Sequence, residues 1–170
     1  VPEDRKTQGV LLNLPIRDNI SMSILKRISN NPLMIVDKKK ENEIQAKHKD
    51  ALRIKTPSML QLVKNLSGGN QQKVVLSKWL ARECKVLIVD EPTRGIDVGT
   101  KHEIYEILNS LAANGMGIIM ISSEMPELLG MADRIVVLSE GHLTGILNRD
   151  EFDQTRILEL ASHEFVEEGA

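Results

Sequence analysis

One short segment constrains the fold of this chain more than any other: the apolar run Val86–Val89, followed at once by Asp90 and Glu91. Such a continuous run is typical of a strand that is buried on both faces of a parallel sheet. A second run, Met116–Ile121, predicts a neighbouring buried strand, and Thr100–Ala113 between them has the apolar spacing of a helix. This order of strand, helix and strand predicts an α/β fold with a parallel sheet.

The first part of the chain predicts helices and no convincing strand. Residues 17–28 form a candidate short helix, which Asn31-Pro32 breaks. Asp37 is the expected N-terminal cap of a second helix, which we predict to end near residue 54. The later part alternates between helices and strands. Besides the elements above, it predicts helices over 71–83 and 126–131, a hairpin over 134–147 and a short helix after 150.

The composition excludes several classes of function. The chain has 170 residues, of which 41% are hydrophobic and 27% charged, as in globular domains. A net charge of -2 and an aromatic content of 2% argue against binding to nucleic acid. No apolar run reaches the roughly 18 residues of a membrane-spanning helix, and the single cysteine, Cys84, cannot form an internal disulfide. The first residue is not Met, so we expect the chain to begin inside a longer protein.

The segment Leu66–Lys73, called here the Gly-Gly segment, predicts an anion site at the start of a helix. Gly68 and Gly69 let the backbone approach a ligand without a Cβ in the way. The N–H groups of a first helical turn attract negative charge, and Ser67 adds a hydroxyl donor. A plain capped helix start after a turn explains the same residues, so this segment alone leaves both interpretations open.

Asp90 and Glu91, called here the acidic pair, stand at the carboxyl end of the first predicted strand, where ligands bind in open α/β sheets. Asp90 is placed to meet a hydrated Mg²⁺, which prefers one or two carboxylates together with phosphate oxygens. Glu91 would orient and deprotonate a water for attack on a phosphoryl group. An acidic loop after a strand is the alternative interpretation.

Together these motifs resemble those of the ABC ATPase family over essentially the whole chain. The Gly-Gly segment is similar to the family signature, Val86–Glu91 to its Walker B strand, and Gly95-Ile96-Asp97 to its D-loop. The resemblance implies a partial P-loop NTPase (RecA-like) core with an α-helical subdomain. Residues 1–84 would hold the end of the Q-loop, the helical subdomain and the signature helix. Residues 85–170 would form the C-terminal half of the core, with a degenerate switch.

The resemblance also implies ATP and Mg²⁺ as cofactors and a second nucleotide-binding domain as partner. The Gly-Gly segment would serve ATP held by that second domain. The acidic pair would serve this domain's own ATP, with Glu91 as the catalytic base and Asp90 holding Mg²⁺ through water. The implied nucleotide-binding residues are Glu3, Ser67, Gly68, Gly69, Gln71, Asp97 and Ser123.

Three departures from the family pattern concern catalysis. The chain contains no G-x-x-x-x-G-K-[ST] loop to cradle the phosphates, so we expect the chain alone to be inactive as an ATPase. Glu3 stands where the family has the Gln of its Q-loop, and its carboxylate would repel phosphate oxygens. Ser123 stands where the family has the switch His, and serine carries no positive charge.

The finer resemblance is to the second nucleotide-binding domain of fused carbohydrate importers, of the ribose or simple-sugar type. It rests on Val1–Lys6, Asn70–Lys73 and Ile121–Glu124. It implies permease subunits, one of which is received in a groove near the segment from about Leu11 to Leu33, and indirectly a solute-binding protein. The subunit would lie on the cytoplasmic face of the inner membrane, and the sequence does not identify the solute.

Two alternatives remain at this point. One is a truncated or degenerate subunit that docks a partner and catalyses nothing. The other is a soluble ABC protein that acts on ribosomes or DNA, which the acidic balance and the lack of a basic linker disfavour. The histidines have no metal-ligand spacing and are predicted as surface or boundary residues: His48, His102, His142 and His163.

Overall fold

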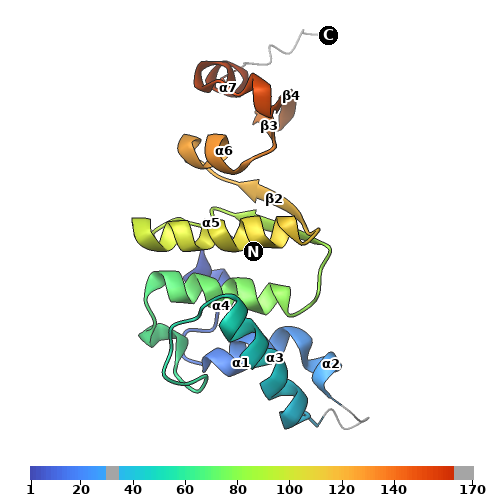
Figure 1. Ribbon diagram of the computed structural model, residues 1–170. Coiled ribbons are helices and arrows are strands. Elements are labelled where there is room, and N and C mark those ends of the chain that lie inside the picture. The colour runs from blue at the N-terminus through green and yellow to red at the C-terminus, as the bar shows by residue number, and fades with distance from the viewer. Residues whose placement is uncertain (30–34, 163–170) are drawn as a thin grey trace, which may run out of the picture. The chain divides into compact units, whose positions relative to one another are not determined.

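The computed structural model describes residues 1–29 and 35–162 (Figure 1). The chain divides into two compact units, Val1–Ile121 and Ser122–Ala170. The boundary that we predicted at residue 84 is a different division: it separates the helical subdomain and signature helix from the C-terminal half of the ATPase core. That boundary stays a prediction. His163 lies outside the described residues, as does the predicted helix break at residues 31 and 32.

The first unit begins with short helices, as the sequence predicts. The predicted helix over 17–28 is present as a chain of three short turns, and Asp37 caps the following long helix by accepting the N–H groups of Lys39 and Lys40. The elements are the π-helix η1 (Arg5–Gly9), α1 (Ile16–Ser21), the 3₁₀ turn η2 (Met22–Ile24), α2 (Leu25–Ile28), α3 (Lys38–Ala51) and the 3₁₀ turn η3 (Val63–Asn65).

Helix α4 (Gly68–Leu80) packs against α1 and against α5 (Val98–Ala113), as the ribbon shows (Figure 1). Its interior residues Val74, Val75 and Leu76 are fully buried, which explains how a helix with a polar start is held in place.

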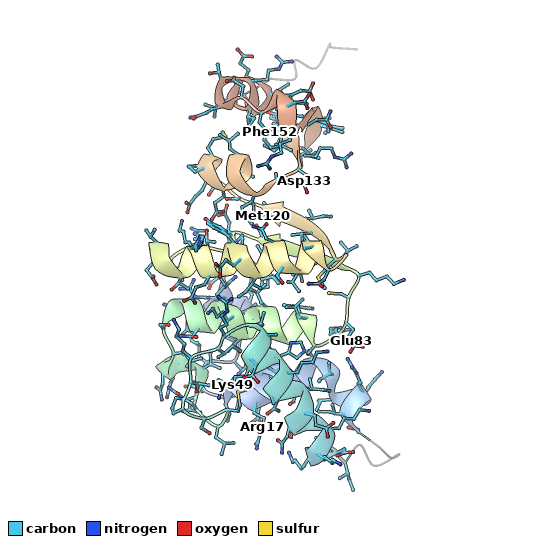
Figure 2. All side chains as sticks on the ribbon, in the orientation of Figure 1. Arg17, Lys49, Glu83, Met120, Asp133 and Phe152 are labelled. Carbon is cyan, nitrogen blue, oxygen red and sulfur yellow. The ribbon has the colours of Figure 1, made fainter. Side chains whose placement is uncertain are left out.

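Helices α1 and α3 and the loop after α3 line a surface hollow of about 420 Å³. Figure 2 labels Arg17 and Lys49, two of its lining residues.

The sheet of the first unit consists of two parallel strands, β1 (Val86–Asp90) and β2 (Gly117–Ile121). Helix α5 connects them, so strand, helix and strand follow the predicted order. Val1 lies along the other edge of β1, where its carbonyl accepts the Asp90 N–H at 3.1 Å. The predicted α/β class with a parallel sheet is therefore confirmed.

The prediction that these strands are buried on both faces is wrong for the described chain. Leu87 and Val89 are buried, but the side chains on the opposite face are about half exposed. Strand side chains alternate between faces, and α5 covers one face only. The exposed set is Val86 at 54%, Ile88 at 52%, Ile119 at 52% and Ile121 at 50%.

The second unit contains the predicted hairpin and two helices. Ile135, Val137, Leu147 and Ile157 form its buried core. No helix in the described parts of either unit is long and apolar enough to cross a bilayer. The elements are α6 (Met125–Met131), β3 (Arg134–Ser139), β4 (His142–Asn148), the 3₁₀ turn η4 (Arg149–Glu151) and α7 (Gln154–Ala161).

Candidate functional site

Ser67 caps the N-terminus of α4, and its neighbour Asn70 controls the hydrogen bonding of its hydroxyl. The Ser67 Oγ accepts the Asn70 backbone N–H at 3.4 Å and the Asn70 side-chain amide at 3.0 Å. The Asn70 amide oxygen accepts the backbone N–H of Lys55 at 2.8 Å, which fixes which end of the amide faces Ser67. A hydroxyl has two acceptor positions and one donor, so only the Ser67 donor is left for a ligand.

Close packing within the protein requires glycine at position 69, whereas a side chain at position 68 would displace the Arg5 guanidinium. A Cβ at Gly69 would lie 2.0 Å from Thr100 Cγ2, on the first turn of α5. A Cβ at Gly68 would lie 2.9 Å from Arg5 Nη2 and 3.5 Å from the Gly95 carbonyl oxygen. The predicted reason for both glycines is the approach of a ligand, whereas the structure gives a packing reason for Gly69 and a contact with Arg5 for Gly68.

Gln71 lies inward from this surface. The residue is only 6% exposed, and its side-chain amide donates to the carbonyls of Val63 at 3.3 Å and Leu66 at 3.2 Å. Gln71 therefore braces the turn that leads into α4. A contact between Gln71 and a nucleotide stays a prediction.

At the acidic pair, where the chain exits β1, Glu91 adopts an unusual backbone conformation. Glu91 has a φ of 45°, in the left-handed region that few residues other than glycine adopt. Its N–H donates to the Ile121 carbonyl at 2.9 Å, so the ladder with β2 continues to the turn. Such a conformation costs about 1–3 kcal/mol and is concentrated at functional sites. Asp90 and Glu91 are both partly exposed at this strand end.

The residues after the acidic pair form a loop, Arg94–Asp97, called here the Gly95 loop. Asp97 caps α5 by accepting the Thr100 N–H at 3.0 Å and the Thr100 hydroxyl at 2.8 Å. These hydrogen bonds from Thr100 hold the pKa of Asp97 below its usual value. Gly95 has a φ of 66°, so this position suits glycine.

Two residues from the start of the chain hold the Gly95 loop. Glu3 forms an ion pair with Arg94. The Arg5 guanidinium donates to the carbonyl of Arg94 at 2.7 Å and to that of Gly95 at 3.1 Å. The expected repulsion between Glu3 and phosphate is therefore offset by a cation, because the Glu3 carboxylate has Arg94 beside it.

The structure thus brings Glu3, the Gly-Gly segment and Asp97 around one loop of the first unit. Ser123 belongs to the second unit, where it is exposed just before α6. Its neighbour Ser122 donates to Glu127 at 2.5 Å. Of the described histidines, His102 and His142 are exposed and His48 is intermediate, where burial lowers its pKa.

The donor set fits Mg²⁺ only in company with a nucleotide. Among the described residues no cluster of three or more His, Cys, Asp or Glu side chains could hold a metal ion. Asp90 supplies one carboxylate at a strand end, and Mg²⁺ commonly binds one or two carboxylates while phosphate and water supply the rest. A site built from Asp90 alone would therefore load with Mg²⁺ and a phosphate ligand together.

Asn70 and Arg5 hold the site together in the structure but are not among the site residues that the sequence predicts. The sequence signal for Asn70 was weak, because its amide donates to the Ser67 hydroxyl and does not accept the Ser67 backbone N–H as the Glu or Gln of a capping box does. Arg5 carried no local signal, since its partners lie 89 and 90 residues away along the chain.

The fold and these motifs define an ATP-binding cassette. The family model described as "ABC transporter" matches residues 6–94, which is over half of the chain. This protein therefore belongs to the ABC transporter family. Its cassette fold is shown by the dimeric post-hydrolysis structure of the ATP-binding cassette MJ0796 bound to ADP and phosphate. That structure matches with a TM-score of 0.70 at 18% identity, over 85% of this chain and 62% of that chain.

Two sugar transport proteins are similar to the chain. The L-arabinose transport ATP-binding protein AraG of Geobacillus stearothermophilus is 53% identical over 170 residues, which are 100% of this chain and 33% of that protein. The ribose import ATP-binding protein RbsA of Clostridium perfringens is 53% identical over 159 residues, covering 94% of this chain and 32% of that protein. The chain thus spans about a third of the length of these relatives.

Proposed function

We propose that this chain is part of the ATP-binding subunit of an ABC importer for a simple sugar or related solute, and that the polypeptide carrying it hydrolyses ATP. The names and the identity of its arabinose and ribose relatives support the solute class. We assign the chain to the second nucleotide-binding domain of such a polypeptide, on the residues Val1–Lys6 and Asn70–Lys73 quoted above.

One observation carries this proposal: the exposed Ser67 hydroxyl is restricted to donating, at the start of a 13-residue helix. The first turn of α4 contains no acidic residue, so the positive end of the helix dipole is not neutralised there. Ser67, Gly68 and Gly69 would therefore bind the terminal phosphate of ATP held by a second nucleotide-binding domain. Gln71 would support them by bracing the turn.

The acidic pair would serve the nucleotide of this domain itself. Glu91, turned out of β1 by its left-handed backbone, would position and deprotonate the attacking water. Asp90 would hold Mg²⁺ through water, and the metal, when bound, would neutralise charge on the phosphates. Asp97, Glu3 and Ser123 are proposed to line the nucleotide sites.

A permease subunit is the proposed membrane partner, docked near α1, with a solute-binding protein acting through it. Three apolar side chains in this region are exposed: Leu11 at 49%, Met22 at 38% and Leu25 at 40%. A partner helix would cover them, and the subunit would then lie on the cytoplasmic face of the inner membrane. Leu33, the last residue of the proposed docking segment, lies outside the described residues.

The test uses the polypeptide that carries this chain, assayed for transport and phosphate release. Ser67→Arg should stop turnover, because it adds bulk and charge where two domains close on a phosphate. Binding of ATP to the open protein should survive. Ser110→Arg, at an exposed serine of α5 outside the motifs, is the matched control. Normal transport with Ser67→Arg would overturn the assignment, and no turnover in the unsubstituted protein would favour the non-catalytic alternative.

A further inference from the structure

The start of the chain, the Gly95 loop and the start of α4 meet at one guanidinium group. Arg5 donates through Nη1 to the Arg94 carbonyl and through Nη2 to the Gly95 carbonyl. The same Nη2 lies close enough to Gly68 that a Cβ there would approach it to 2.9 Å. Arg5 therefore contacts two of the three motifs, and it is itself held at the first position of η1, directly after the capping residue Asp4.

The geometry of the two hydrogen bonds from Arg5 requires an arginine side chain. A guanidinium is planar and presents several N–H donors in a fixed fork, so it can satisfy two successive carbonyls at once. Lysine has one ammonium group on a flexible stem and cannot reproduce this fork. The carbonyl of Gly95 is directed by a left-handed backbone, with φ at 66°, that other residues rarely adopt.

A second contact from the start of the chain holds the Gly95 loop through a side chain of the loop. Glu3 pairs with the Arg94 side chain, while Arg5 takes the Arg94 carbonyl. The loop ends at Asp97, which caps α5, and α5 in turn packs its Thr100 against Gly69. A shift of the Gly95 loop would therefore change the spacing between Ser67–Gly69 and Asp97.

We propose that Arg5 is a positioning residue that locks the Gly95 loop against Gly68, and so sets the geometry of the proposed phosphate site. The catalytic part of this inference rests on the proposed function, and the structural part does not. Arg5 itself contacts the protein and touches no nucleotide in this proposal.

The structural part is tested on the 170-residue chain by amide hydrogen exchange. Arg5→Gln should speed exchange of the Ile96 N–H, which donates to the Thr93 carbonyl, by about tenfold or more, since two charge-assisted hydrogen bonds are lost. Arg5→Lys should give an intermediate rate. Arg82→Gln, at an exposed arginine of the same unit, is the control and should leave the rate unchanged. Equal rates in Arg5→Gln and the control, or equal acceleration of all amides in the first unit, would overturn the proposal.

A double-substitution cycle separates positioning from general destabilisation. Gly68→Ala should also speed Ile96 exchange, because its Cβ displaces Arg5 Nη2. In the Arg5→Gln background the same Gly68→Ala change should add little, since the displaced group is gone. Additive effects of the two substitutions would show that Arg5 and Gly68 act independently and would overturn the proposal.

The catalytic part is tested in the polypeptide that carries this chain. Arg5→Gln should lower kcat for phosphate release by about tenfold with little change in KM, and Arg5→Lys should restore part of it. Faster exchange with an unchanged kcat would overturn the catalytic part alone. Absence of ATP hydrolysis in the unsubstituted polypeptide would instead overturn the proposed function, whatever the exchange rates show.

Discussion

The side-chain amide of Asn70 donates to the Ser67 hydroxyl oxygen at 3.0 Å, while the other end of the same amide is held by the backbone of Lys55. This relationship sets the direction of the one hydrogen that Ser67 can offer. It makes the capping serine of α4 a donor towards solvent, which is the polarity that an anion requires.

Asn70→Asp should reverse this polarity with almost no change of shape. A carboxylate cannot donate, so the Ser67 hydroxyl would turn to donate to it, while the Lys55 N–H would keep its acceptor. In the polypeptide that carries this chain we expect phosphate release to fall roughly 100-fold, as for the loss of one donor to a transition state. Adding Ser67→Ala should then cost nothing further. A further large loss would show that the introduced carboxylate acts by charge repulsion alone.

An ion pair with one buried partner connects α4 to α5 and should respond asymmetrically to mutation. Lys73 is 1% exposed and donates to Glu103 at 2.5 Å, whereas the Glu103 side chain is 29% exposed and also pairs with Lys55. Glu103→Gln leaves a buried cation without its anion, so we expect a loss of about 3 kcal/mol in the free energy of unfolding. Lys73→Met removes the buried charge and should cost about 1 kcal/mol or less.

The measurement is urea unfolding followed by the fluorescence of Trp79, the single tryptophan, which reports on the first unit. Lys55→Met serves as the control, since it removes the exposed partner of the same carboxylate. A larger loss for Lys73→Met than for Glu103→Gln would contradict the argument from burial.

The same carboxylate gives the first unit a predictable sensitivity to acid. Hydrogen bonds from Lys73 and then Lys55 hold the pKa of Glu103 below its usual value of 4.5. The folded state therefore binds this proton more weakly than the unfolded state, so the stabilisation is present above pH 4.5 and is lost as the pH falls through the lower, folded pKa. Unfolding free energies measured from about pH 7 to about pH 3 should fall less steeply for Glu103→Gln than for the unsubstituted chain. Parallel curves would contradict this.

Local signals in the sequence predicted most of the elements. Asp37 marks the start of α3, and the apolar spacing in Thr100–Ala113 marks α5, because capping and helical periodicity act within a few residues. The burial of Val86 and Ile88 was overestimated, since an apolar run does not reveal whether a second layer covers the strand.

The candidate site was predictable in its motifs and not in its connections. Ser67, Asp90 and Glu91 lie in short segments that the sequence marks by their motifs, and their roles at a nucleotide stay predictions. The contacts of Arg5 and Glu3 with the Gly95 loop join residues about 90 positions apart, and no periodicity encodes such a contact. The packing of Gly69 on Thr100 is hidden for the same reason.

The 170-residue chain alone should not release phosphate from ATP. It contains the acidic pair but no loop of the G-x-x-x-x-G-K-[ST] type, so the phosphates have no cradle and Mg²⁺ lacks its hydroxyl ligand. The assay is phosphate release by the purified chain with Mg²⁺. Turnover that copurifies through several columns and disappears with Glu91→Gln would contradict the prediction.

The two ATP sites of the proposed polypeptide should differ in speed. Glu3 does not support this difference, because Arg94 neutralises it. Ser123 does if it holds the switch position that we propose for it, since a serine there offers no positive charge to the transition state. Glu91 would then be a base without an electrostatic partner, in a slow site, whereas Ser67–Gly69 would complete the fast site of the other domain.

Paired substitutions in the whole polypeptide test this difference. Glu91→Gln should reduce phosphate release less than about tenfold, while the equivalent Glu→Gln in the other nucleotide-binding domain should reduce it by roughly 100-fold or more, the usual contribution of a general base. Ser123→His should raise the cost of Glu91→Gln, because a histidine would make the second site productive. Equal losses at both sites, with no effect of Ser123→His, would mean that serine replaces the histidine in function and that the sites are equivalent.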